Sequence, residues 1–105
     1  MKAIESKEDF GQLMNQDKPV LLDFYADWCG PCQSLLPVVE KLSKEYEGKV
    51  EVRKVNVDQH RELAAQFQVR SIPALFFLKD SKVVDQLIGV APEGELRNKL
   101  DVLAN

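Results

Sequence analysis

The residues from Val20 to Ala26 form one nearly continuous apolar run, and this run most narrows the folds open to the chain. A strand with one solvated face alternates apolar and polar residues, whereas a strand buried on both faces of a parallel sheet does not. Asp23 is the only charged residue in the run. We therefore predict a central strand of a parallel sheet that is covered on both faces.

Helical patterns precede and follow this strand. Ser6 and Asp9 resemble a capping box, and apolar residues follow them at helical spacing. A longer helix is predicted from Cys32 onward, with a kink near Pro37. Asp58 is predicted to be the N-cap of a short third helix.

Extended segments alternate with these helices at residues 2–4, 20–26, 50–57, 74–79 and 82–88. Asp80 and Ser81 are predicted to join the last two as a hairpin, and Pro92 to lie in the first turn of a final helix. Strand–helix alternation implies parallel pairing through right-handed crossovers, to which the hairpin adds an antiparallel edge. We predict an α/β fold, βαβαβαββα, with a central mixed β-sheet and helices on both faces.

The length and charge of the chain exclude several classes of protein. Its 105 residues contain no repeat or linker, so we predict a single domain over residues 1–105 and expect a monomer. With 14 Lys and Arg against 17 Asp and Glu, no cationic surface for nucleic acid is expected. The longest apolar run, residues 74–78, is far below the ~20 residues of a membrane span. Because the first residues lack the apolar core of a secretion signal, we expect a cytoplasmic protein with no membrane contact.

The segment Trp28-Cys29-Gly30-Pro31-Cys32 follows the central strand, at the sheet edge where α/β proteins place their reaction sites. Cys29 is expected at the start of the next helix, where unpaired N–H groups and the helix dipole favour a thiolate. Cys32 lies one helical turn later, so the two sulfurs can meet. Pro31 suits a first helical turn, Gly30 leaves the approach open, and Trp28 forms an apolar lip beside the exposed sulfur. The pattern predicts a dithiol that exchanges with disulfides.

Three alternatives to a redox pair are weaker. A structural disulfide across so short a loop would constrain the unfolded chain by only ~2 kcal/mol. A zinc site needs four ligands, whereas the chain has two Cys and one His. A buried apolar pair would not explain Gly30 and Pro31. The one histidine, His60, is expected to face solvent in the first turn of the short helix, without a catalytic role.

The run from Val20 to Cys32 closely resembles the thioredoxin family, and the resemblance extends along nearly the whole chain. The matching positions beyond the run are Pro37, Lys54, Ser71-Ile72-Pro73 and Gly89, and Asp23 matches within it. The resemblance implies a thioredoxin fold and a protein-disulfide reductase that acts on disulfide-containing proteins. It also implies that no cofactor or metal is bound and that thioredoxin reductase returns electrons from NADPH.

Asp23 and Lys54 are the candidate residues that support the cysteines. A carboxyl group in an apolar strand is expected to be desolvated and to have a raised pKa, unless hydrogen bonds satisfy it at the strand end. The family uses the matching aspartate to exchange a proton with Cys32 through water. The resemblance implies that Lys54 approaches Asp23 and moderates its titration; the alternative is a solvated lysine at a strand end.

The resemblance also implies a shallow apolar groove for the partner protein. Pro73 is expected to follow a cis peptide bond and to face the cysteines, although the sequence alone favours trans. The exposed backbone of Ile72 would then pair with an extended segment of the partner. The predicted groove residues are Trp28, Gly30, Pro31, Ile72, Pro73, Gly89 and Val90.

Several positions depart from the family pattern, and two other functions stay open. Gln33 stands where the family often has Lys, Ala74 replaces the common Thr, and Tyr25 stands where many members have Trp. The Gly-Pro dipeptide places no imidazolium near Cys29, which predicts a relatively reducing couple.

The alternatives to a disulfide reductase are a binding module within another enzyme and a metal-binding structural domain. A periplasmic or secreted oxidoreductase is a further possibility if a leader has been removed.

Overall fold

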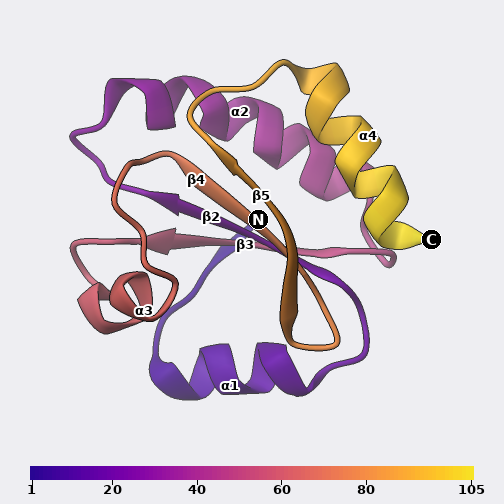
Figure 1. The fold of residues 1–105 in the computed structure, drawn as a ribbon, viewed down its shortest axis with the longest axis horizontal. Coiled ribbons are helices and arrows are strands. Elements are labelled where there is room, and N and C mark those ends of the chain that lie inside the picture. Colours follow the sequence, from indigo (N-terminus) through magenta and orange to yellow (C-terminus); the bar gives the residue numbers. More distant parts are fainter.

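The computed structural model describes all 105 residues and contains one five-stranded sheet in the order β1-β3-β2-β4-β5 (Figure 1). The elements are β1 Lys2–Ala3, α1 Lys7–Asn15, β2 Val20–Tyr25, α2 Gly30–Glu45, β3 Glu51–Asn56, α3 Arg61–Gln66, β4 Ala74–Lys79, β5 Lys82–Ile88 and α4 Glu93–Ala104. β1 and β2 pair with β3 in parallel, whereas β4 pairs antiparallel with both β2 and β5. The predicted order and the mixed sheet are confirmed.

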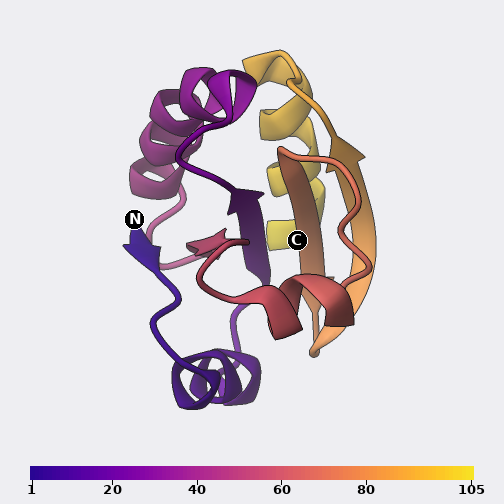
Figure 2. The same cartoon turned by 90° about the vertical axis from the view of Figure 1, so that its left-hand side faces the viewer.

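Helices cover both faces of the sheet, with α2 and α4 on one side and α1 and α3 on the other (Figures 1 and 2). Every residue of β2 is buried, as the apolar run predicts. Leu21 packs in the core under α2 and α4, while its neighbour Leu22 packs in the core over α1 and α3. None of the helices has both the length and the apolar composition that crossing a membrane requires.

The helix starts agree with the sequence at one position and differ at two. Ser6 caps α1, because its Oγ accepts a hydrogen bond from Asp9 N at 3.0 Å. The prediction that Asp58 caps the third helix is wrong: α3 begins after His60, a half-buried N-cap whose side chain makes no capping hydrogen bond. Pro92 is the N-cap of α4 and not a residue of its first turn.

The end of α3 is closed by a residue that is unusual at its position. Gln68 N donates to Ala65 O and Val69 N donates to Ala64 O, both at 3.0 Å, which is the Schellman pattern. The residue between the helix and Val69 must then be left-handed, and Gln68 has φ 56°. Glycine adopts this conformation without the steric cost that a Cβ adds, so Gln68 is under local strain.

Replacing Gln68 with Gly relieves this strain. We expect Gln68→Gly to raise the free energy of unfolding by roughly 0.5–1 kcal/mol, since the left-handed cost exceeds the added entropy of the unfolded chain. Urea unfolding measures the change. The matched control is Gln66→Gly, which puts the same residue at the last position of α3 and should lower stability. Equal decreases in the free energy of unfolding for both variants would contradict the strain at Gln68.

Candidate active site

The cysteine pair lies where the chain passes from β2 into α2. Cys29 is the N-cap of α2, and its Sγ accepts a hydrogen bond from Cys32 N at 3.2 Å. Gln33 N donates to the carbonyl oxygen of Cys29 at 3.1 Å. The first turn of α2 therefore directs an N–H group and the positive end of its dipole at this sulfur, and both favour a thiolate in the reduced protein.

Cys29 and Cys32 form a disulfide with their Cα atoms 5.2 Å apart. Both residues are buried, and only 5% of Cys29 is exposed. The expectation of an exposed sulfur at position 29 is therefore wrong for this disulfide form. Tyr25 and Ala26 pack against the pair from the end of β2, and Ile72 packs against it from the opposite side. Only a narrow edge of Cys29 is therefore exposed to a partner in this disulfide form.

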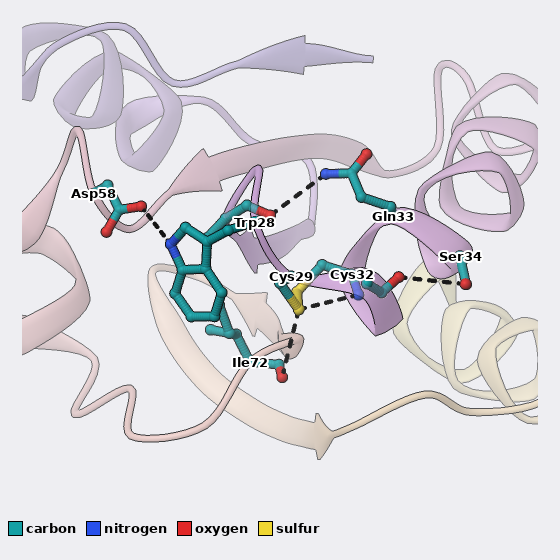
Figure 3. The surroundings of a disulfide bond; sticks show 9 residues. Trp28, Cys29, Cys32, Gln33, Ser34, Asp58 and Ile72 are labelled. Carbon is teal, nitrogen blue, oxygen red and sulfur yellow. Dashed lines mark hydrogen bonds between the residues drawn. A yellow bond between two sulfur atoms is a disulfide. The ribbon is translucent and has the colours of Figure 1, made fainter.

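Trp28 is the apolar lip of this edge and is held in place by an acid. The Trp28 residue is 71% exposed, and its indole Nε1 donates to Asp58 Oδ2 at 2.8 Å (Figure 3). This role of Asp58 was not predicted from the sequence. The available signal was position: Asp58 follows β3 and Trp28 follows β2, and the carboxyl ends of neighbouring parallel strands lie together.

The segment before β4 forms the other side of the groove. The Ile72–Pro73 peptide bond is cis, as the resemblance implies. The Ile72 carbonyl oxygen lies 3.9 Å from Cys29 Sγ (Figure 3). Gly89 N donates to the carbonyl oxygen of Pro73 at 2.8 Å, which brings the start of the α4 connection to the same place. Val90 follows it with an exposed side chain.

The rest of the predicted groove lies in the first turn of α2. Gly30 and Pro31 are its first two residues, and a Cβ added at Gly30 would meet no atom within 4 Å. Gly30 therefore faces open space, as expected for the approach to Cys29. The Gln33 amide donates to Ala26 O at 3.4 Å and braces the turn between β2 and α2 without adding a charge.

Asp23 is buried without a hydrogen-bond partner. It is 1% exposed, and neither carboxylate oxygen has a partner, so the alternative of an acid satisfied by hydrogen bonds is wrong. Desolvation by burial raises the pKa of Asp23 to about 7, and the charge of Lys54 opposes this rise. Asp23 shares its face of β2 with Leu21, which packs beneath α2. A carboxyl group with this pKa can hold or release a proton near neutral pH.

Lys54 lies on β3 directly beside Asp23 in the parallel register. It is half-buried, and its Nζ lies 5.5 Å from the ring centroid of Tyr25. The aromatic face supplies a cation–π contact that holds the ammonium group toward the sheet. Lys54 therefore points inward and is not a solvated lysine at a strand end. No group of three or more Cys, His, Asp or Glu side chains is arranged so that it could hold a metal ion.

The buried carboxyl makes stability depend on pH. The pKa of Asp23 is about 7 in the folded protein and about 3.9 in an unfolded chain, so between these values the folded state binds more protons. The contribution of Asp23 to the free energy of unfolding should therefore be fully present below pH 4 and be lost as pH rises to 7, a fall of up to about 4 kcal/mol. We expect Asp23→Asn to remove this fall, as measured by guanidinium unfolding from pH 4 to 8.

Lys54→Met provides the matched control for this titration. Loss of the nearby positive charge should raise the pKa of Asp23 further, so the fall in stability should extend to higher pH. A wild-type protein whose pH profile matches that of Asp23→Asn would show that the buried carboxyl does not titrate as described.

Comparisons with known proteins agree with this geometry. The thioredoxin family model matches residues 2–102. A thioredoxin of Chlorobaculum thiosulfatiphilum is 46% identical over 90 residues, which cover 86% of this chain and 83% of that protein. The solved thioredoxin of Fasciola hepatica has a TM-score of 0.89 and 39% identity, covering 98% of this chain and 99% of that one. The solved thioredoxin of Malassezia sympodialis has a TM-score of 0.91 and 33% identity, covering 100% of this chain and 91% of that one. The chain belongs to the thioredoxin family, and its cysteine pair is that of a thiol–disulfide oxidoreductase.

Proposed function

We propose that the protein reduces disulfides of partner proteins and is itself oxidised to the Cys29–Cys32 disulfide. The observation that carries the proposal is the position of Cys29 as the N-cap of α2, with Cys32 N donating to its sulfur. A cysteine sulfur that accepts a hydrogen bond from an N–H group at a helix start loses its proton more readily than the thiol of a free cysteine. The second sulfur is close enough to form the disulfide.

In the first step, the Cys29 thiolate attacks one sulfur of the partner disulfide. A bond forms between Cys29 Sγ and that sulfur, the partner disulfide breaks, and the second partner sulfur leaves as a thiolate. The Ile72 backbone, beside Cys29, is available to pair with an extended partner segment. The exposed face of Trp28 and the side chain of Val90 border the same edge.

In the second step, Cys32 loses its proton and attacks Cys29 Sγ. The mixed disulfide breaks, the partner leaves with both sulfurs reduced, and the Cys29–Cys32 disulfide forms. Cys32 is 1% exposed, so bulk water is a poor base for it. We propose that Asp23, whose pKa is about 7, accepts this proton through water and that Lys54 limits how far that pKa rises.

Thioredoxin reductase is the proposed electron donor that returns the disulfide to the dithiol, with NADPH as its source. The family relationship supports this partner. We also propose a reducing compartment, the cytoplasm, because a reductase must be kept reduced to act. The protein would work there as a monomer and would bind no cofactor itself.

Single-cysteine variants test the exchange reaction. Mixed with insulin, Cys32→Ser should accumulate a covalent complex that dithiothreitol releases, because the mixed disulfide has no resolving sulfur. Cys29→Ser should form none, because its remaining sulfur is buried in α2. Non-reducing electrophoresis and mass spectrometry measure the complex. Equal trapping by both variants, or none by either, would contradict Cys29 as the nucleophile.

The redox potential tests the direction of the reaction. Because Gly30 and Pro31 place no cation between the cysteines, we expect a couple more reducing than the about −180 mV of a disulfide isomerase. Titration in graded dithiothreitol buffers, followed by Trp28 fluorescence, gives the value. A potential at or above that of an isomerase would make the protein an oxidant instead.

With NADPH and thioredoxin reductase, the wild type should reduce insulin and the double Cys→Ser variant should not.

A further inference from the structure

A hollow of about 260 Å³ lies on the α1 and α3 side of the sheet, between the end of α3 and β5. Phe67 and Phe76 line it with aromatic rings, and Ile88 lines it from β5. Arg70 and Ser71 border it from the connection between α3 and β4. The hollow is not among the features that the cysteine chemistry uses.

This hollow adjoins the reaction groove through the chain itself. Arg70 and Ser71 directly precede Ile72, whose carbonyl oxygen lies 3.9 Å from Cys29 Sγ. On the opposite wall, Ile88 pairs with Ala74, immediately after Pro73. A partner segment that pairs with the backbone of Ile72 and continues toward Ser71 therefore enters the hollow.

Charge complementarity indicates what kind of segment fits. Arg70 is the only charged residue that lines the hollow, and its exposed guanidinium group makes no ion pair or hydrogen bond within the protein. Arg53 and Arg97 pair with carboxylates, whereas Arg61, which also makes no ion pair, lies at the start of α3 outside the hollow. An acidic side chain of a partner would give Arg70 the bidentate contact that a guanidinium group favours.

The hollow continues into a second one of about 460 Å³ that shares Phe67 and Phe76 and reaches α1 at Phe10. Two apolar side chains of β5 border the pair of hollows and are half exposed, Val83 at 49% and Ile88 at 54%. No segment of the chain covers them. An apolar side chain of a partner would bury this surface.

We propose that these two hollows form a specificity site for protein substrates, which selects an acidic residue near the reacting cysteine together with a bulky apolar residue beyond it. The proposal rests on the function proposed above. Arg70 lies two residues before Ile72, in the connection that leads into β4. We therefore place the acidic residue two positions from the partner's cysteine, on the side that faces Ser71.

Peptide disulfides test the charge preference in a single turnover. Each peptide carries one cysteine as a mixed disulfide with thionitrobenzoate, and Glu, Gln or Lys two positions before or after that cysteine. The reduced protein attacks the peptide sulfur and releases thionitrobenzoate, the better leaving group, which is followed by absorbance. For wild type, we expect the second-order rate constant to be about fivefold higher with Glu than with Lys, a size typical of exposed charge pairs.

Arg70→Glu should invert this preference, so that the Lys peptide reacts faster. The matched control is Lys79→Glu, which makes the same kind of charge change at the far end of β4, outside both hollows. Its Glu-to-Lys ratio should stay that of wild type. Equal Glu-to-Lys ratios in wild type and Arg70→Glu would overturn the proposal. A change in Lys79→Glu as large as that in Arg70→Glu would also overturn it, because it would show that the preference comes from long-range attraction only.

The apolar part is tested with Leu or Ser placed beyond the Glu. Wild type should prefer Leu severalfold, and Ile88→Ser, at an exposed position, should lose this preference.

If no peptide reacts faster with the protein than with free cysteine, the proposed function itself fails. If all peptides react fast but equally, only the specificity site fails. A dimer in sedimentation that Ile88→Lys disrupts would show that a second copy covers the hollows, and would overturn the proposal.

Discussion

The hydrogen bond from Cys32 N to Cys29 Sγ is the interaction on which the chemistry of this protein depends. It exists because β2 ends just before the motif and α2 begins immediately after Cys29, so a sulfur occupies the N-cap where Ser or Asp usually stands. The same cap places the second sulfur one turn away on the buried side of the helix. One local feature of the backbone thus gives Cys29 Sγ a hydrogen-bond donor and brings a second sulfur within disulfide distance.

The burial that holds this helix end in place also sets the acid–base chemistry beneath it. β2 is buried along its whole length because helices cover both faces of the sheet, and Asp23 lies in the middle of it without a hydrogen bond. An uncompensated buried carboxyl opposes folding once it is ionised. Lys54 offsets part of that cost from the neighbouring strand. Asp23 therefore lowers stability when it is ionised, at the position where we propose that it exchanges a proton with Cys32.

Much of the fold could be predicted from the sequence, because its signals are local. The run from Val20 to Tyr25 is a strand, and Ser6 caps the first helix through a residue three positions away. Predictions failed where a cap depends on more distant packing. Asp58 is not the N-cap of α3, since its carboxylate instead binds the Trp28 indole. Cys29 was expected to be exposed, but Ile72 packs against it from a segment far along the chain.

The order of the elements, the two buried faces of the central strand and the pair of sulfurs at a helix start could all be predicted from the sequence alone. Each of these follows from residues within a turn or two of one another. The folded structure was needed to show that Asp58 holds Trp28, that Lys54 points inward and not into solvent, and that Arg70 borders a hollow beside Ile72. Such contacts join different strands and loops, and the packing of helices on a twisted sheet sets their distances, which no local pattern encodes.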